Sequence, residues 1–467
     1  MLSVCAGGQR SVGRSSRREF LRIGTSAIGA LSLPGLLAAK ASAAGPAVKD
    51  TSVVVLNLQG GPTQFETFDP NMQAPSEVRS MTGEIKTALP GVTFGGSFPQ
   101  LAALADKMAV VRSYRHGISS HGPAAMHVMA GGNPTGAMMG ALYSRVAGLT
   151  NAVTGVPKNV LVTSRAVGSQ HKELDYNADR DRVSQTGSLA SAYRPFDPSA
   201  GSELLKNMQL QIENGRLDDR RGLLSGLDAL RRNFDDGRLE TANRFQQQAF
   251  EVLVRGVAAA FDLSKEDPGT LARYDTSQFE PNNGVKQRNG YAKQFSPVAL
   301  GKQMLLARRL CEAGGGFVTV TSPGWDMHGG GKEFTMADGL SSLTPAVDRA
   351  ASAFIEDVHE RGLNEKILLV ITGEFGRTPR LNKNGGRDHW GNLCTLAFAG
   401  GGLQMGQVVG KSDRTGSQPA VDPISSTNVL ATIMHTLFDI GQVRLMTGIP
   451  KEVERVITGG QPIRELV

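Results

Sequence analysis

Cysteine is scarce in this chain of 467 residues, which has only Cys5, Cys311 and Cys394. So few cysteines exclude a small domain held together by a network of disulfides. Cys311 lies in a helical pattern and Cys394 in a strand pattern. A disulfide between them stays open from sequence, but two buried thiols are the expected state. The chain is long enough to bury a large core without such cross-links.

Apolar runs long enough to span a membrane are also missing. The paired arginines Arg17-Arg18 precede a short apolar stretch, 23–37, and the small-residue sequence Ala41-Ser42-Ala43. This order predicts a cleavable signal peptide, 1–43, that the twin-arginine export machinery recognises. The alternative, an uncleaved membrane anchor, is disfavoured because Pro34 breaks the short stretch. We expect a periplasmic or extracellular protein with no stable membrane span after cleavage.

A strong basic excess is absent once the predicted signal peptide is set aside. The chain has 50 Lys and Arg against 43 Asp and Glu, and residues 1–43 contain six of the basic residues and one acidic residue. The remainder has 44 basic and 42 acidic residues, a net charge of +2. No dense basic stripe with interleaved aromatics occurs, so we expect no nucleic-acid partner.

What the chain does contain is an alternation of apolar β-branched runs and helical patterns. This alternation predicts a mostly parallel sheet that helices cover on both faces. We expect one such domain over 44–467, with a helical insertion at about 203–294. The predicted strands are 52–58, 107–113, 159–163, 317–321, 366–372 and 393–399. The predicted helices are 296–313, 343–361 and 427–438.

Residues with metal-binding or acid–base chemistry gather in the loops that follow predicted strands. In open α/β sheets, the loops at the carboxyl ends of strands form the ligand site. Five of the eight histidines lie in such loops, together with two aspartates. These residues are His116, His121, His127, His328, His389, Asp326 and Asp388. Because these residues cluster at strand ends, a purely structural protein of the cell envelope is the least supported hypothesis.

Two glycine-bracketed loops carry a possible metal site. Asp326 and His328 are two residues apart after a predicted strand, so both side chains can face one divalent ion. His389, in the loop 385–392, would complete an Asp/His/His set with an open position for water. We expect zinc, manganese or calcium. The alternatives are an aspartate that holds its own turn beside a surface histidine, and a lid loop packed by Trp390.

Further candidates surround this set. Glu374 could be a ligand or a general base, and Arg377 could bind an anionic group through its planar guanidinium. The alternative is an ion pair between these two residues. His121 opens a predicted helix whose N-terminus favours an anion. His127, on the same helix, is expected to be a helix-face or core histidine.

The loop 59–70 has weaker evidence. Gly60-Gly61 would allow the backbone to approach a ligand closely. A single pair of glycines is neither a dinucleotide fingerprint nor a phosphate-binding loop.

Taken together, these stretches resemble an uncharacterised bacterial family, the domain of unknown function 1501. The resemblance covers essentially the whole chain after the signal. It is carried by Gly60-Gly61-Pro62 to Phe68-Asp69-Pro70, His121-Gly122-Pro123-Ala124, Trp325-Asp326-Met327-His328, Gly373 to Pro379 and Gly386 to Trp390. The family looks like a distant branch of the alkaline phosphatase and sulfatase superfamily. This implies a three-layer α/β/α sandwich and, by analogy, metal-dependent hydrolysis of phosphate or sulfate esters.

The resemblance implies that half of the superfamily's two-metal site survives. Asp326, His328 and His389 resemble the ligands of one metal. The other half has lost its carboxylates, because the first strand ends in Gln59-Gly60 and the later Asp-His pair is Glu374-Phe375. A two-metal mechanism is therefore not expected.

The resemblance places His121 at the position of the superfamily's nucleophile. It implies an exported single-metal hydrolase of sulfate or phosphate esters, acting on an anionic ester or glycan. The catalytic residues would be His121, Glu374 and Arg377, and the substrate-binding residues Gly60, Gly61 and Asp388. The alternative is a non-catalytic module that binds an anionic glycan or a partner protein in the same pocket.

Overall fold

The structure is a computed structural model that describes residues 46–171, 177–200, 257–281, 286, 295–330 and 334–467. The predicted signal peptide and most of the predicted insertion lie outside these residues. Within the described ranges, no helix combines the length and the hydrophobicity needed to cross a bilayer.

Seven strands form the central sheet, in the order β11-β4-β10-β7-β1-β6-β5. β10 is antiparallel to both of its neighbours, and every other pair is parallel. The sheet is therefore mostly parallel, as predicted. The strands are β1 (Ser52–Gln59), β4 (Met108–Val111), β5 (Asn159–Val162), β6 (Phe317–Pro323), β7 (Ile367–Thr372), β10 (Leu396–Gly400) and β11 (Gln407–Val409).

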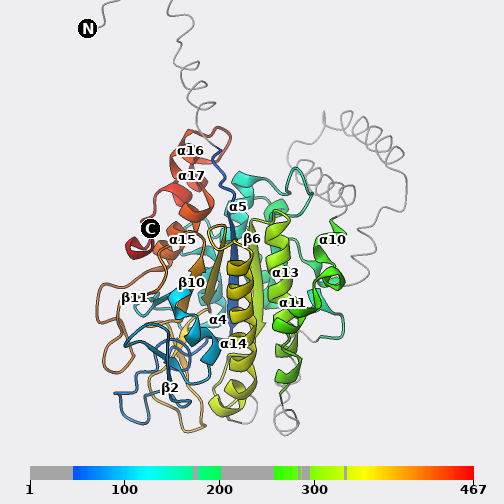
Figure 1. The fold of residues 1–467 in the computed structure, drawn as a ribbon. Coiled ribbons are helices and arrows are strands. Elements are labelled where there is room, and N and C mark those ends of the chain that lie inside the picture. Colours follow the sequence, from blue (N-terminus) through cyan, green and yellow to red (C-terminus); the bar gives the residue numbers. More distant parts are fainter. Residues whose placement is uncertain (1–45, 172–176, 201–256, 282–285, 287–294, 331–333) are drawn as a thin grey trace, which may run out of the picture.

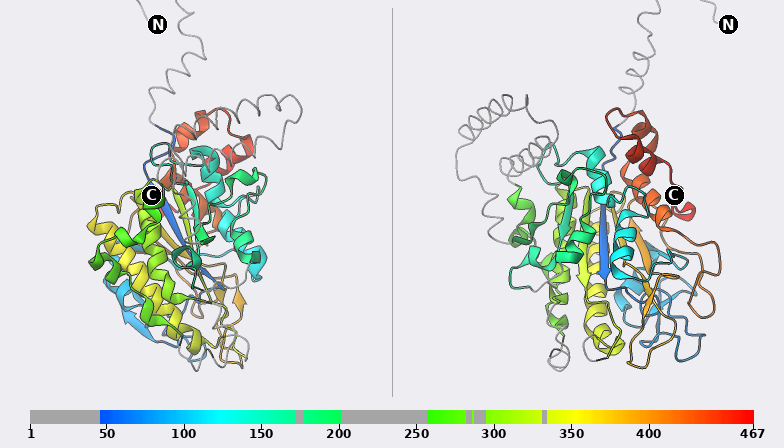
Figure 2. Two further views of the ribbon diagram at one scale, coloured as in Figure 1. Left: turned by 90° about the vertical axis from the view of Figure 1, so that its right-hand side faces the viewer. Right: turned by 180° about the vertical axis from the view of Figure 1, so that it is seen from behind.

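Helices cover both faces of this sheet (Figures 1 and 2), which makes the domain a three-layer α/β/α sandwich. Val54 and Leu56 of β1 point into one hydrophobic core, and Val53 and Val55 point into the other. The first core is closed by α3 (Pro99–Ala103), α13 (Leu300–Glu312) and α14 (Met336–Glu360). The second is closed by α4 (His121–Ala130), α5 (Met139–Ala147), α15 (Ser426–Leu437) and α17 (Lys451–Thr458).

The longest of these helices, α14, begins earlier than the predicted helix 343–361. Gly339 and Pro345 lie inside it, and both residue types weaken a helical pattern read from sequence. Packing explains the glycine, since a Cβ at Gly339 would lie 2.7 Å from the sulfur of Met327. The Thr335 side chain caps the helix by accepting the backbone N–H of Asp338.

The described part of the predicted insertion, 257–281, contains the short helices α10 (Ala258–Phe261) and α11 (Pro268–Arg273). Ion pairs anchor it, because Glu266 binds the buried guanidinium of Arg308 on α13 at 2.7 Å. Both described cysteines are buried thiols, as expected from the sequence.

Sheet order brings together loops that are far apart in sequence. β7, β1 and β6 are neighbours and parallel, so the segments that follow them emerge at one edge of the sheet. The chain after β4 reaches the same edge and turns into α4 at His121. This edge carries the candidate site.

Candidate metal centre

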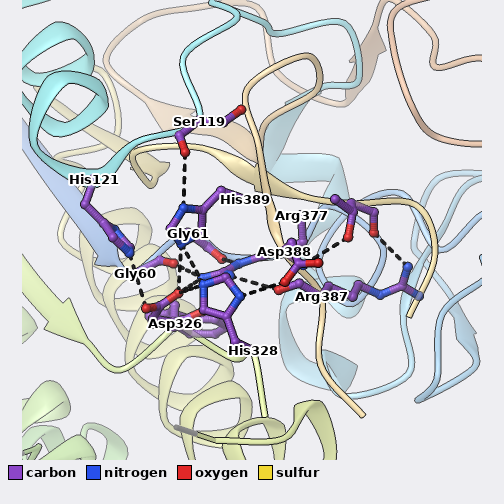
Figure 3. A network of polar contacts seen from close by, with 12 residues as sticks. Gly60, Gly61, Ser119, His121, Asp326, His328, Arg377, Arg387, Asp388 and His389 are labelled. Atoms are coloured by element: carbon purple, nitrogen blue, oxygen red, sulfur yellow. Dashed lines mark hydrogen bonds and ion pairs between the residues drawn. The ribbon is translucent and has the colours of Figure 1, made fainter. Parts of the chain in front are cut away.

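Four side chains from three segments converge at the carboxyl ends of the strands (Figure 3). Asp326 and His328 follow β6, His389 begins the short strand β9 (His389–Trp390), and His121 begins α4. Asp326 Oδ1 lies 3.0 Å from His328 Nε2 and 3.2 Å from His389 Nε2, and these two nitrogens are 2.8 Å apart. Asp326 Oδ2 lies 3.2 Å from His121 Nε2.

In two of these histidines, the contact made by Nδ1 indicates which ring nitrogen carries the hydrogen. His389 Nδ1 lies 3.1 Å from the carbonyl oxygen of Ser119, which can only accept a hydrogen bond. His328 Nδ1 lies 3.0 Å from the Asp388 carboxylate. Both Nδ1 atoms must therefore donate. In neutral imidazoles the Nε2 atoms then carry lone pairs, and these face each other and Asp326 Oδ1. Arg377 donates to Asp326 Oδ1 at 2.6 Å and lies 3.5 Å from His328 Nε2, and the remaining convergence of lone pairs fits a bound cation or additional protons.

The donor set and its spacing fit a small divalent metal. Tetrahedral zinc with ligand bonds of about 2.0–2.1 Å holds its ligand atoms roughly 3.3 Å apart. The spacings of 2.8–3.2 Å among Asp326, His328 and His389 are close to this value. His121 also reaches the centre, because His121, Asp326 and His389 offer ligand atoms that all lie within 4.8 Å of one another.

His121 bridges two carboxylates. Its Nδ1 lies 2.9 Å from Glu374 Oε1, and its Nε2 faces Asp326. Burial lowers the pKa of His121, but its hydrogen bonds to Asp326 and Glu374 outweigh burial and raise the pKa to about 9. Burial has the opposite effect on Asp326 and raises its pKa. Hydrogen bonds from the three histidines and the charge of Arg377 outweigh burial and hold the pKa of Asp326 well below its usual range.

Glu374 is buried beside this bridge. Its Oε1 atom also accepts the backbone N–H of Gly60 at 2.8 Å. Its Oε2 atom is buried and has no hydrogen-bond partner among the described residues. Glu374 bonds to His121 and not to Arg377, so the alternative ion pair between Glu374 and Arg377 is not formed. The geometry instead fits a carboxylate that orients His121.

Arg377 is also buried, at 1% exposure, and its donors point into the protein. Its Nη2 lies 2.6 Å from Asp326 Oδ1, and its Nε donates to the carbonyl oxygen of Gly61 at 2.8 Å. Other bonds run to the carbonyl oxygens of Gly60, Trp325 and Arg387. The predicted role of Arg377 in binding a substrate anion does not fit this geometry, because its planar donor set is already used.

The three residues expected to bind substrate have internal partners as well. The left-handed φ of +112° at Gly60 accommodates a close approach, but a Cβ there would meet the Asp326 backbone nitrogen at 2.3 Å. A Cβ on Gly61 would meet the ring of Phe375 at 2.4 Å. The close approach predicted for these glycines is thus to protein atoms. Asp388 remains 58% exposed and orients His328.

Two residues near the centre, Ser119 and Asn382, have no role in the sequence prediction, and a third, Phe375, enters it only as the replacement for a lost histidine. Ser119 contributes its carbonyl oxygen to His389, and its hydroxyl oxygen accepts the backbone N–H of Gly391 at 2.9 Å; no sequence pattern reveals these contacts. Asn382 donates to Asp388 Oδ1 at 3.1 Å and to the carbonyl oxygen of His328 at 3.0 Å. Its position at the start of a glycine-rich loop is a usable signal, since asparagine side chains organise turns. Phe375 packs against His389, with ring centroids 4.4 Å apart.

His116 and His127 lie away from the ligand atoms, although the sequence grouped them with the centre. Their ring centroids are 5.5 Å apart, and His116 Nε2 lies 3.5 Å from Cys394 Sγ. Burial, with a smaller contribution from His127, lowers the pKa of His116 to about 4, so this imidazole is neutral. His127 lies on a helix face, as expected.

Comparison with known proteins gives distant structural likenesses and one family. No curated protein matches the chain. The sulfatase PsFucS1 from Pseudoalteromonas sp. is 13% identical, with 88% of this chain and 74% of that chain covered and a TM-score of 0.32. The lipoteichoic acid synthase LtaP from Listeria monocytogenes is 9% identical, with 89% and 77% covered and a TM-score of 0.37. The phosphonate monoester hydrolase SpPMH from Silicibacter pomeroyi is 13% identical, with 89% and 77% covered and a TM-score of 0.32.

A family model described as a protein of unknown function, DUF1501, matches residues 50–467, and the chain belongs to this family.

Proposed function

We propose that this protein is an exported hydrolase that uses one divalent metal to cleave sulfate or phosphate esters, including esters on polysaccharide. One observation carries the proposal. The Nδ1 atoms of His328 and His389 are committed to Asp388 and to the Ser119 carbonyl, so both Nε2 lone pairs converge on Asp326. A ligand set held by outer partners in this way is typical of built metal sites.

The residues present divide into ligands and an acid–base pair. Asp326, His328 and His389 would hold the metal, which when bound would polarise an ester oxygen and lower the pKa of water. His121 lies beside these ligands and is within reach of a proton at the reacting oxygen. Glu374 holds His121 Nδ1 at 2.9 Å and thereby sets the orientation of the ring. To act as a covalent acceptor, His121 would first have to release its Nε2 proton, because its two carboxylate partners raise its pKa to about 9.

A non-catalytic binding module is the second candidate, and Phe375 favours it. Its ring fills the position beside His121 and His389, with centroids 5.0 and 4.4 Å away. Gln59-Gly60, at the end of β1, adds no carboxylate to the centre. Such a centre would bind an anionic glycan or a partner protein without turnover.

Metal analysis of protein purified without chelator tests the proposal. We expect about one zinc or manganese ion per chain, and its loss in Asp326→Ala. Asp50→Ala is the matched control, because the Asp50 side chain is 90% exposed and far from the centre in the sheet. A protein without stoichiometric metal, whose stability is unchanged by Asp326→Ala, would contradict the proposal.

Turnover separates the two candidates. A hydrolase cleaves members of a panel of sulfate and phosphate esters, and His121→Ala abolishes cleavage while Asp326, His328 and His389 keep the metal. Metal-loaded wild type that binds sulfated glycan but cleaves no ester in the panel would support the binding module instead.

A further inference from the structure

Arg377 lies at the junction of three loops that build the centre. It belongs to β8 (Gly376–Arg377), which follows β7 and pairs with β9, so that Arg377 is opposite His389. Its guanidinium bonds to Gly60 and Gly61 after β1, and to Trp325 and Asp326 after β6. One side chain thus joins the ends of three adjacent strands.

We infer that Arg377 is a positioning residue that orients the Asp326 carboxylate for metal binding, a role that rests on the proposed function. The 2.6 Å bond from Nη2 occupies one side of Asp326 Oδ1. The bond prevents rotation of the carboxylate and leaves its remaining lone pairs directed toward the histidine nitrogens.

The surroundings hold Arg377 itself in place. Gln64 accepts the Arg377 backbone N–H and donates to its carbonyl oxygen, each at 2.9 Å. The backbone of Gly60 packs closely against the backbone of Asp326, which leaves no room for the loop that carries Asp326 to shift. Both the guanidinium and the carboxylate are therefore supported by rigid backbone.

Only arginine satisfies this arrangement. The guanidinium presents five N–H donors in a fixed plane, whereas lysine presents a compact ammonium with three. A lysine at 377 would keep the positive charge but could not serve the Asp326 carboxylate and the carbonyl oxygens of three loops at once. Arg377→Lys therefore separates the geometry of the guanidinium from its charge.

Arg387 provides a matched control in the same loop region. Its guanidinium is also fully buried and donates to the carbonyl oxygens of Val78, Arg79 and Thr378, at 2.8, 3.1 and 3.0 Å. None of its bonds among the described residues reaches Asp326. We therefore expect Arg387→Lys and Arg377→Lys to lower the free energy of unfolding by similar amounts. A difference in metal binding between them then reflects the contact with Asp326.

The experiment is titration of metal-free protein with Co²⁺, followed by the visible absorption of the bound ion. We expect Arg377→Lys to weaken Co²⁺ binding by about 10- to 100-fold and to change the absorption bands, as loss of outer-shell partners does. Arg387→Lys should retain the wild-type affinity and spectrum. Gln64→Ala, which leaves the guanidinium intact but loosens its backbone, should weaken binding less; it replaces Arg377→Lys if that variant does not fold.

Two results would overturn the inference. The first is a folded Arg377→Lys variant that keeps the wild-type Co²⁺ affinity and spectrum; if only Gln64→Ala folds, the same result in that variant counts. Either outcome would exclude the positioning role and leave the proposed function standing. A wild-type protein that binds no Co²⁺, zinc or manganese would refute the proposed function and the inference together.

Discussion

Gly60 illustrates how much of the candidate centre depends on a missing side chain. Its N–H binds Glu374, its carbonyl oxygen binds Arg377, and its backbone packs on Asp326. Gly60→Ala would combine an unfavourable φ of +112° with a 2.3 Å clash against the Asp326 backbone. We expect loss of metal binding together with at least several kcal/mol of stability.

Gly91→Ala is the control for this variant. Gly91 also has a positive φ, +77°, but no heavy atom lies within 4 Å of a Cβ built there. It should cost only about 1 kcal/mol and leave metal binding intact. Equal effects of the two substitutions in denaturant unfolding and metal titration would contradict the packing argument.

At the scale of elements, a buried ion-pair network joins α13, α14 and the segment before α11. Arg308 is 2% exposed and contacts Glu266 at 2.7 Å and Asp357 at 3.0 Å. Arg308→Met would remove one cation from these carboxylates, while Arg309 still pairs with Glu266 at 2.8 Å and Arg361 with Asp357 at 2.7 Å, so we expect a loss of about 1–3 kcal/mol in the free energy of unfolding. Urea titration measures this loss. Arg273→Ala, which breaks the more exposed pair with Glu360, should cost no more than about 1 kcal/mol.

Asp348 on α14 makes stability depend on pH. Burial raises its pKa to about 6, although it accepts the backbone N–H groups of Gln100 and Leu101. The folded state therefore binds a proton that the unfolded state releases, and the contribution of Asp348 to stability falls as the pH rises from about 4 to 6. In Asp348→Asn this decline should disappear. Unfolding free energies measured across that range that run parallel in both proteins would contradict the assignment.

The elements also show how far sequence patterns reach. The strands 52–58 and 366–372 are predicted almost to the residue, because strands buried on both faces are continuous apolar runs. The start of α14 is not, since the packing of Met327 against Gly339 is a tertiary contact that only the folded chain brings about. The antiparallel direction of β10 has no sequence signal either, because direction depends on the connection and not on the strand.

At the scale of the whole molecule, export remains a prediction of the sequence, because residues 1–43 lie outside the described structure. Replacing both arginines, Arg17→Lys with Arg18→Lys, should leave the uncleaved precursor in the cytoplasm. Cell fractionation and the mass of the mature chain measure this. The control, Arg10→Lys with Arg14→Lys, preserves the pair and should be exported normally. Normal export of the first variant would contradict the twin-arginine assignment.

The sequence by itself determined the layered α/β architecture and placed the candidate ligands Asp326, His328 and His389 in loops that follow strands. Strand periodicity and ligand chemistry are local properties, and loops after parallel strands must meet at one edge. Only the tertiary structure decided what each neighbouring residue does. Whether Arg377 faces a substrate or the protein depends on which acceptors surround it. Those acceptors, at Gly60, Trp325 and Arg387, are backbone carbonyl oxygens that every residue possesses, so their arrangement exists only in the folded chain.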